Sequence, residues 1–325
     1  STLYFHADDG TGGYELWKSD GTSSGTVMVR DIGGYGTSSS SLPSELTAIG
    51  NTLYFRADDG TNGKELFVSD GTSTGTVMVK DIYSGSSSSS PTSLTVAGST
   101  LYFKAEDGTN GQELWKSDGT ATGTVMVKNI VSGSGHSIPQ YLTAVGNTVY
   151  FSADDATNGR ELWKSDGTSA GTVMVKDIVS GSGSSYPAFS AVVGNTLYFR
   201  ANDGTNGIEL WKSDGTSSGT VMVKDINSGS SGSAPYWLTA VGSTLYFWAN
   251  DGTNGFELWK SDGTSSGTVM VKNINSGSSS SSPQWLTAVG STLYFQANDG
   301  TNGAELWKSD GTSSGTVIVK DIDSG

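Results

Sequence analysis

Short apolar segments recur along this chain at a nearly fixed spacing. The triplet Leu-Tyr-Phe, written Val-Tyr-Phe once, begins at residues 3, 53, 101, 149, 197, 245 and 293. Glu-Leu-Trp and Thr-Val-Met-Val, or close variants, follow each triplet, and from the second triplet onward a stretch such as Leu-Thr-Ala-Val precedes it. These segments are rich in β-branched and aromatic residues and are bounded by Gly, Asn or Asp. The pattern predicts short β-strands.

One repeat unit therefore contains four strands: A (Leu-Thr-Ala-Val), B (Leu-Tyr-Phe-x-Ala), C (Glu-Leu-Trp-Lys) and D (Thr-Val-Met-Val-Lys-Asp-Ile). Gly-Asn or Gly-Ser joins A to B, and Asp-Gly occurs in the B–C and C–D connections, which predicts antiparallel hairpins. Only D to the next A needs a long crossover, a Ser/Gly tract that ends in proline. Each such unit is typical of one propeller blade, packed on both faces by its neighbours.

The predicted fold is all-β, a seven-bladed β-propeller of four-stranded antiparallel blades in a single domain over residues 1–325. The units run at about 1–32, 33–82, 83–130, 131–178, 179–226, 227–274 and 275–325. Strands B, C and D occur seven times but strand A only six times, so we expect the first blade to lack its inner strand. An unpaired B edge invites pairing. We expect either that the chain was cut from a longer array or that a neighbouring molecule donates the strand, giving self-assembly.

Charge and composition limit the classes of partner and of chemical site that can be expected. The net charge of −14 and the pI near 4.4 disfavour phosphate backbones and anionic lipid surfaces, so nucleic acid is not expected as a partner. No apolar run reaches the roughly 18 residues of a membrane helix, so membrane insertion is not expected. The chain has no cysteine, which excludes disulfides, thiolate metal sites and cysteine nucleophiles.

Residues that recur in every unit are best interpreted as structural. The repeated Leu, Tyr, Trp and Val positions predict an inter-blade core. The aspartate of each Ser-Asp-Gly-Thr segment is expected to cap its own turn by accepting backbone N–H groups. These seven aspartates are Asp20, Asp70, Asp118, Asp166, Asp214, Asp262 and Asp310.

The octapeptide Glu-Leu-Trp-Lys-Ser-Asp-Gly-Thr at 15–22, 113–120, 161–168, 209–216, 257–264 and 305–312 resembles the ELWxxDGT repeat of secreted or surface bacterial proteins. The resemblance covers the whole chain. Unit two departs from it, with Phe67 and Val68 in place of Trp and Lys. The resemblance implies a repeat-built protein with an extracellular or cell-surface location, and it brings no enzymatic activity.

Variation among the near-identical units marks a candidate site. It concentrates after Leu-Tyr-Phe, before Glu-Leu and before strand A, three positions that alternating strand directions bring to one rim of the ring. The candidate ligand-binding residues are His6, Tyr14, Arg56, Lys64, Lys104, Gln112, Tyr141, Arg160, Phe189, Arg200, Trp237, Trp248, Phe256 and Trp285. Aromatic, cationic and amide side chains suit sugars and also protein partners. Neutral drift at loop-proximal positions is the alternative explanation.

Cross-strand pairing would strengthen the site. A symmetric B–C hairpin places Trp248 opposite Phe256, a favourable aromatic pair. The same register places Arg56 opposite Lys64, which is unfavourable. Of the 18 Lys and Arg residues, 13 occupy two repeated positions, after Trp in strand C and after Val-Met-Val in strand D, and the other five lie at the variable positions.

Calcium is the only cofactor that the sequence suggests. The loop between strands B and C in unit two carries the oxygen ligands Asp58, Asp59, Asn62 and Glu65. The loop lacks the alternating Asp-x-Asp-x-Asp spacing of a dedicated calcium loop, and Ala156 interrupts it in unit four. A plain hairpin turn is the favoured interpretation of this loop.

The favoured function is a non-enzymatic extracellular binding or adhesion module with a carbohydrate or surface-protein ligand, whose weak equivalent sites gain avidity from repetition. The two histidines, His6 and His136, do not recur, and no pair of acids stands apart from the repeated ones. One alternative is a structural building block of a surface layer or filament. Another is a glycoside hydrolase, which requires two acids with perturbed pKa in a central funnel.

Overall fold

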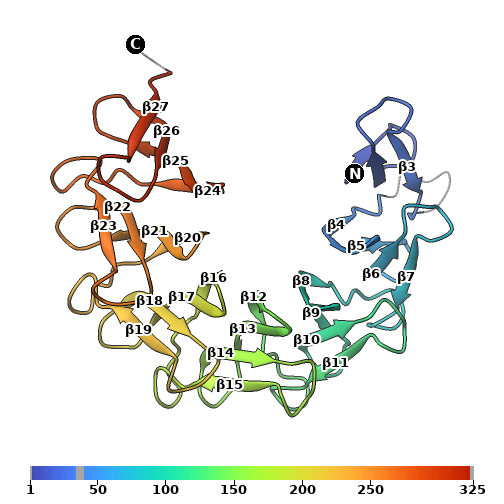
Figure 1. The fold of residues 1–325 in the computed structure, drawn as a ribbon. Coiled ribbons are helices and arrows are strands. Elements are labelled where there is room, and N and C mark those ends of the chain that lie inside the picture. Colours follow the sequence, from blue (N-terminus) through green and yellow to red (C-terminus); the bar gives the residue numbers. More distant parts are fainter. Residues whose placement is uncertain (1, 34–39, 323–325) are drawn as a thin grey trace. The chain divides into compact units, whose positions relative to one another are not determined.

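The computed structural model describes residues 2–33 and 40–322 as 27 strands in seven antiparallel sheets (Figure 1). Six sheets have four strands in the order A-B-C-D, and the first has three, in the order B-C-D. This confirms the predicted seven-bladed β-propeller and the missing strand A of the first blade. No helix in the described part of the chain is long and apolar enough to cross a membrane.

The strands occupy equivalent places in successive units. The A strands are β4 (Ser44–Ile49), β8 (Thr92–Ala97), β12 (Gln140–Val145), β16 (Ala188–Val193), β20 (Tyr236–Val241) and β24 (Gln284–Val289). The B strands are β1 (Leu3–Asp8), β5 (Thr52–Asp58), β9 (Thr100–Glu106), β13 (Thr148–Asp154), β17 (Thr196–Asn202), β21 (Thr244–Asn250) and β25 (Thr292–Asn298). The C strands are β2 (Tyr14–Ser19), β6 (Lys64–Ser69), β10 (Gln112–Ser117), β14 (Arg160–Ser165), β18 (Ile208–Ser213), β22 (Phe256–Ser261) and β26 (Ala304–Ser309). The D strands are β3 (Val27–Arg30), β7 (Val77–Lys80), β11 (Val125–Lys128), β15 (Val173–Lys176), β19 (Val221–Lys224), β23 (Val269–Lys272) and β27 (Val317–Lys320).

The chain divides into two compact units. The first contains residues 1–156 and 164–173, and the second contains residues 157–163 and 174–325. Blades 1 to 3 belong wholly to the first unit and blades 5 to 7 to the second. Within each unit the A strands lie beside one another, β4 against β8 and β8 against β12 in the first, and β16 against β20 and β20 against β24 in the second.

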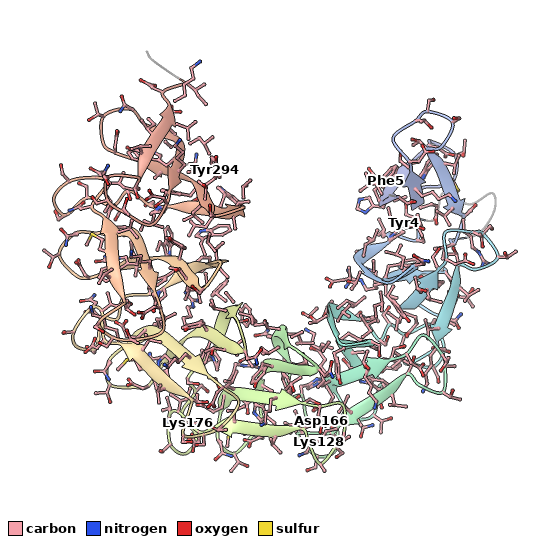
Figure 2. The ribbon with its side chains drawn as sticks, viewed as in Figure 1. Tyr4, Phe5, Lys128, Asp166, Lys176 and Tyr294 are labelled. Atoms are coloured by element: carbon pink, nitrogen blue, oxygen red, sulfur yellow. The ribbon has the colours of Figure 1, made fainter. Side chains whose placement is uncertain are left out.

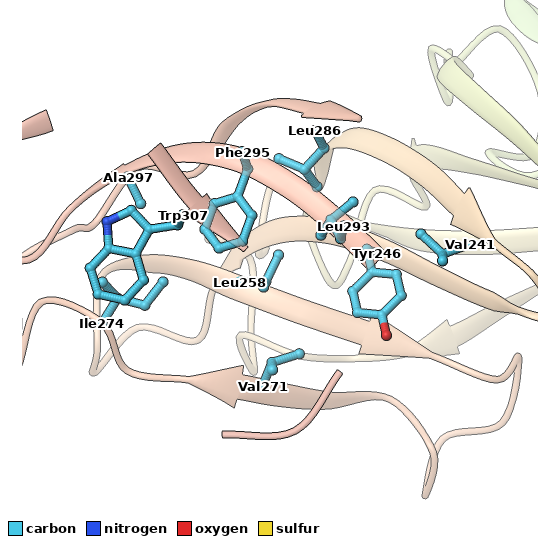
Figure 3. Close-up of a cluster of buried hydrophobic side chains, with 10 residues drawn as sticks. All are labelled: Val241, Tyr246, Leu258, Val271, Ile274, Leu286, Leu293, Phe295, Ala297 and Trp307. Carbon is cyan, nitrogen blue, oxygen red and sulfur yellow. The ribbon is translucent and has the colours of Figure 1, made fainter. Parts of the chain in front are cut away.

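The recurring apolar residues form the core between blades, as predicted. In the second unit, Leu258, Val271 and Ile274 of blade 6 meet the aromatic side chains of Phe295 and Trp307 of blade 7 (Figure 3). The equivalent cluster of the first unit joins the same positions of blades 2 and 3. Because strands B and C contribute to the packing on both faces of a blade, their central residues are almost entirely buried.

Strand D is shorter than its apolar pattern predicts. It was expected to run from Thr to Ile, yet the fourth strand of blade 2 covers only Val77–Lys80. The Thr76 hydroxyl before it donates to the Thr72 carbonyl at 2.7 Å in the preceding turn, and the Ile82 N–H after it donates to the Glu65 carboxylate at 3.1 Å. The Ile82 N–H therefore bonds a glutamate side chain and does not extend the strand ladder.

The repeated cations tie each blade to the next. In strand C, the Lys18 ammonium donates to the Gly71 carbonyl of the following blade at 2.8 Å. In strand D, Lys128 donates to the Thr172 carbonyl at 2.8 Å, and Lys176 makes the equivalent bond to Thr220 (Figure 2). Each of these bonds runs from one blade to the turn of its successor. The same contacts recur for Lys116, Lys212 and Lys260 in strand C, and for Arg30, Lys80, Lys224 and Lys272 in strand D.

Candidate functional site

Each A strand begins with a β-bulge. In blade 6, Tyr236 pairs with Trp248 and Thr239 pairs with Tyr246, so strand A has one residue more than strand B over this interval. The residue after the first pair adopts a left-handed backbone conformation. This holds for all six A strands, with φ of 60° at Glu45, 59° at Ser93, 55° at Tyr141, 51° at Phe189, 55° at Trp237 and 57° at Trp285.

None of these six left-handed residues is glycine. A side chain in this conformation costs roughly 1–2 kcal/mol per residue, because Cβ approaches the following carbonyl oxygen. A threonine hydroxyl supports the turn in several blades, as when Thr239 donates to the Trp237 carbonyl at 3.0 Å and Thr287 to the Trp285 carbonyl at 3.0 Å. Bulges re-aim side chains, and strained backbone of this kind concentrates at functional sites. The position is therefore a candidate for binding.

Aromatic side chains at these bulges form a row in the second unit. The rings of Phe189 and Tyr236 lie 4.0 Å apart between centroids, and those of Tyr236 and Trp237 lie 5.9 Å apart. Trp237 reaches Trp285 of the next blade at 4.7 Å. The aromatic row, defined as Phe189, Tyr236, Trp237 and Trp285, thus crosses the three strands β16, β20 and β24.

The aromatic row continues onto strands B and C. Trp248 contacts Tyr236 at 5.8 Å and Phe256 at 5.1 Å. The Arg200 guanidinium lies 4.3 Å from the Phe189 ring centroid and 5.2 Å from that of Tyr236, within the range of cation–π attraction. Six of the fourteen predicted residues are therefore joined through Tyr236: Phe189, Arg200, Trp237, Trp248, Phe256 and Trp285.

The predicted B–C register is wrong, although the ring contact that it implied exists. Trp248 pairs with Leu258, and Phe256 pairs with Asn250. The two rings meet diagonally, a separation that aromatic side chains can span. The same register places Lys64 opposite Asp58, which removes the unfavourable pairing with Arg56 that the symmetric hairpin required.

A pocket of about 340 Å³ opens beside the aromatic row. Its lining comprises Phe189, Ser190, Tyr236, Trp237 and Leu238. Trp285 at the end of the row is 63% exposed, so its ring offers a surface rather than a wall. Sequence comparison missed Tyr236, which occupies the first position of strand A. Its signal was available one residue before Trp237, where the other units carry Ser, Thr, Gln or Ala.

The corresponding edge of the first unit is more polar. A pocket of about 430 Å³ lies among Glu45, Lys104, Tyr141 and their neighbours. The Glu45 carboxylate accepts the Ser93 N–H at 2.8 Å, and Arg56 Nε donates to the Ser44 hydroxyl at 3.1 Å. The structure thus places three predicted residues, Lys104, Tyr141 and Arg56, along this edge.

The other predicted residues lie in the second half of strand B, as His6 does in β1, or at the start of strand C. The His6 and Tyr14 rings meet edge to face at 5.7 Å. Lys64, Gln112 and Arg160 begin strand C, where their N–H groups bond the crossover segment. Their partners are Ser88 Oγ at 2.9 Å, His136 Nδ1 at 3.0 Å and Ser184 Oγ at 2.9 Å.

The loop that carries the candidate calcium ligands uses its oxygens within the chain. The Asp58 carboxylate accepts the Gly60 N–H at 2.8 Å, and the Asp59 carboxylate accepts from Thr61 N at 2.9 Å and from Asn62 N at 2.7 Å. Partial burial raises the pKa of Asp59, but the hydrogen bonds from Asn62 and Thr61 outweigh it and hold that pKa below its usual value. Residues 2–33 and 40–322 contain no group of three or more His, Cys, Asp or Glu that could hold a metal ion. Calcium at this loop stays a hypothesis beside the favoured interpretation of a plain hairpin turn.

Glu65 has a different role from the other three residues of that loop. It is completely buried, and its carboxylate accepts the Ser89 hydroxyl at 2.6 Å, the Ser89 N–H at 2.9 Å and the Ile82 N–H at 3.1 Å. These bonds fasten the D-to-A crossover to strand C. Glu15, Glu113, Glu161, Glu209 and Glu257 hold serines at the equivalent position. The signal was the recurring Ser-x-Pro before each strand A.

The repeated turns confirm the structural interpretation of their aspartates. Asp70 accepts the Thr72 N–H at 2.8 Å and the Thr72 hydroxyl at 2.7 Å. The six equivalent aspartates make the same backbone bond. The Thr72 hydroxyl bond, followed by the backbone bond, lowers the pKa of Asp70 from its usual value of 3.8.

We expect the protein to be most stable between pH 3.8 and 4.5. Burial raises the pKa of Glu113 above its usual 4.5, more than hydrogen bonds from Ser137 and Ile130 lower it. A raised folded-state pKa means that stability is greatest with the buried carboxyl protonated and declines as pH rises through that pKa. The lowered pKa of Asp70 acts in the opposite sense, and stability declines as pH falls below 3.8. Burial raises the pKa of Glu65, Glu161, Glu209 and Glu257 in the same way.

Thermal melts across this range test the expectation. The melting temperature should rise as pH falls from neutral to 4.5 and then drop below 3.8. Acidification also makes the net charge of −14 less negative, which reduces charge repulsion within the protein. The Glu113→Gln variant therefore serves as the control. Its melting temperature should depend less on pH above 4.5. A wild-type melting temperature that increases from pH 4.5 to neutral contradicts the assignment.

Comparisons with known proteins support the fold alone. No family model and no curated protein matches the chain. Among solved structures, the computationally designed Ika8 protein is similar with a TM-score of 0.53 and 18% identity, over 98% of this chain and 83% of that chain. A structure from a study of two prolyl endopeptidases has a TM-score of 0.53 and 11% identity over 98% of this chain. Prolyl oligopeptidase B from Galerina marginata has a TM-score of 0.52 and 9% identity, again over 98%.

The likeness to the peptidases is partial. This chain spans 48% of the endopeptidase chain and 49% of the Galerina chain, so it covers about half the length of each. At these identities the similarity concerns the path of the backbone and carries no residue of a catalytic site. The chain is a β-propeller.

Proposed function

We propose that this protein is a non-enzymatic extracellular module that binds a glycan through the aromatic row of its second unit. The observation that carries the proposal is the set of aromatic side chains held at strained bulge positions, with Trp237 and Trp285 in ring contact at 4.7 Å. Aromatic rings cover the apolar faces of sugars, and the polar groups around them bond the hydroxyls. Evolution commonly retains such strain where the side chain serves function.

The pocket favours a sugar over a protein as the first ligand to test. Its volume of about 340 Å³ lies in the range of small-molecule sites, roughly 300–1,000 Å³. The net charge of −14 favours neutral glycans over polyanionic ones. The extracellular location rests on the resemblance of the Glu-Leu-Trp-Lys-Ser-Asp-Gly-Thr repeats to those of secreted and surface proteins.

The repeated acids support a non-enzymatic role. A hydrolase needs two carboxyl groups poised beside its substrate. Here the Asp70 carboxylate caps a turn and the Glu65 carboxylate is buried against Ser89 and Ile82, and their equivalents do the same in other blades. These carboxylates have structural partners within the chain.

A glycan array with the full chain tests the proposal. We expect hits among neutral glycans. Trp237→Ala and Trp285→Ala should each raise Kd by about tenfold or more, which corresponds to the loss of roughly 1.4 kcal/mol of binding free energy from one stacked ring. Trp285→Ala is the cleaner variant because 63% of that side chain is already exposed.

Tyr186→Ala is the matched control. Tyr186 is also an exposed aromatic residue of the second unit with a left-handed backbone, 64% exposed and with φ of 50°, and it does not line the pocket. Its Kd should equal that of the wild type, and thermal melts should show all three variants folded at the assay temperature. A blank array, or tryptophan variants that bind like Tyr186→Ala, refutes the proposal. Capture of a protein ligand with a blank array would favour a protein partner instead.

A further inference from the structure

The aromatic row crosses blades rather than lining a single one. Phe189, Trp237 and Trp285 hold the same bulge position in three successive A strands, β16, β20 and β24. Neighbouring strands of this series contact each other. Tyr236 bridges Phe189 and Trp237, with its centroid 4.0 Å from the first ring and 5.9 Å from the second. The aromatic row is therefore continuous across blades 5, 6 and 7.

The two ends of the aromatic row differ in their exposure to solvent. Phe189, Tyr236 and Trp237 line the pocket of about 340 Å³, whereas Trp285 is 63% exposed and lies outside it. Leu286, which follows Trp285 on β24, is buried, but the last three residues of that strand are exposed, with Val289 at 60%. A site for one sugar would need only the pocket. A pocket that continues into an exposed tryptophan accommodates a ligand that extends beyond it.

We propose that the aromatic row binds a neutral β-1,4-linked glycan along its length, with one sugar residue in the pocket and a later one stacked on Trp285. This inference rests on the proposed function and specifies its ligand class. In β-1,4-linked glucose and N-acetylglucosamine chains the ring substituents are equatorial, so successive residues form an extended ribbon with an apolar face. Each ring of the aromatic row can cover one part of that ribbon. A linear ligand also suits the aromatic row because Phe189, Trp237 and Trp285 hold the same position in successive blades.

The length of the ligand is the variable that tests this inference. Calorimetry would measure Kd for the cello-oligosaccharide and chito-oligosaccharide series, from the monosaccharide to the tetrasaccharide, with the full chain. We expect Kd in at least one series to fall about tenfold or more between disaccharide and tetrasaccharide, as the ligand reaches Trp285. Maltotetraose, which is α-1,4-linked and curved, should bind at least tenfold more weakly than the preferred tetrasaccharide.

Two variants locate the ends of the ligand. Trp285→Ala should raise Kd for the tetrasaccharide to about the disaccharide value and leave Kd for the disaccharide unchanged. Phe189→Ala removes a pocket wall and should weaken binding at every length. Tyr186→Ala should preserve the whole length dependence, and far-UV circular dichroism should confirm that each variant is folded.

Failure of this inference differs from failure of the proposed function. If no glycan binds in either series or on the array, both are wrong. If glycans bind but the tetrasaccharide binds no better than the disaccharide, or if Trp285→Ala weakens all lengths equally, the extended mode is wrong and glycan binding stands. Preference for maltotetraose over both β-1,4-linked tetrasaccharides refutes the linkage.

Discussion

Replacing Glu113 by alanine is expected to lower the free energy of unfolding by about 3 to 5 kcal/mol, because several buried donors lose their acceptor at once. The carboxylate accepts the Ser137 hydroxyl at 2.6 Å, the Ser137 N–H at 3.2 Å and the Ile130 N–H at 3.2 Å. A buried donor left unpaired costs about 1–3 kcal/mol, and water entering the vacated space recovers part of the loss. Urea unfolding followed by tryptophan fluorescence measures the change.

A graded control separates hydrogen bonding from packing. Glu113→Gln keeps the side-chain volume and one acceptor oxygen, and we expect it to lose about half as much stability as the alanine variant. Ser137→Ala removes only the 2.6 Å hydroxyl bond and should cost about 1–2 kcal/mol. A loss below 1 kcal/mol for Glu113→Ala would mean that the crossover is held by its other contacts, contrary to the network described above.

Phe103→Ala should be similarly damaging, with an expected loss of about 3–5 kcal/mol. The Phe103 ring is completely buried in a cluster that contains Leu66, Val79 and Ile82 of the preceding blade. Its removal leaves a cavity between two blades that cannot close without moving a sheet, so both the transfer free energy and the cavity term are lost. Urea unfolding midpoints and slopes report the change.

Controls for this variant come from the same chain. Phe103→Leu fills most of the cavity and should lose less than half of that stability. Tyr186→Ala truncates an aromatic side chain that is 64% exposed and should change stability by no more than about 0.5 kcal/mol. A Phe103→Ala protein as stable as Tyr186→Ala would show that the triplets do not form the core between blades.

The repeat pattern was sufficient to predict the number of blades and the order of strands, because each strand is defined by local hydrophobicity and by the turn residues around it. The C-terminal end of strand D differs from the prediction for a non-local reason. The N–H of Ile82 bonds Glu65, which lies 17 positions earlier. The bond of Glu15 to Ser41 spans 26 positions. Propensity contains no information on such long-range acceptors, so the role of the buried glutamates was not predicted.

The candidate site was located by variation rather than by motif. Differences among near-identical units pointed to Phe189, Trp237 and Trp285, and the structure connects these residues through rings. The left-handed backbone at the three positions could not be predicted, since the bulge arises from the pairing of strands A and B and the residues are neither glycine nor asparagine. Tyr236 was not predicted, because only the position that follows it, that of Trp237, was recognised as variable among the units.

The direction of the lysine bonds has a consequence for how such a chain can change over evolutionary time. Each blade presents lysine donors toward its successor and turn carbonyls toward its predecessor, as Lys80 does toward Thr124 and Lys128 toward Thr172. The two sides are complementary and nearly the same at every junction, so unequal crossing-over that duplicates or deletes one whole repeat recreates a native junction. Repeat number can therefore drift by integers without a new interface having to evolve, while the residues at the bulges diversify independently.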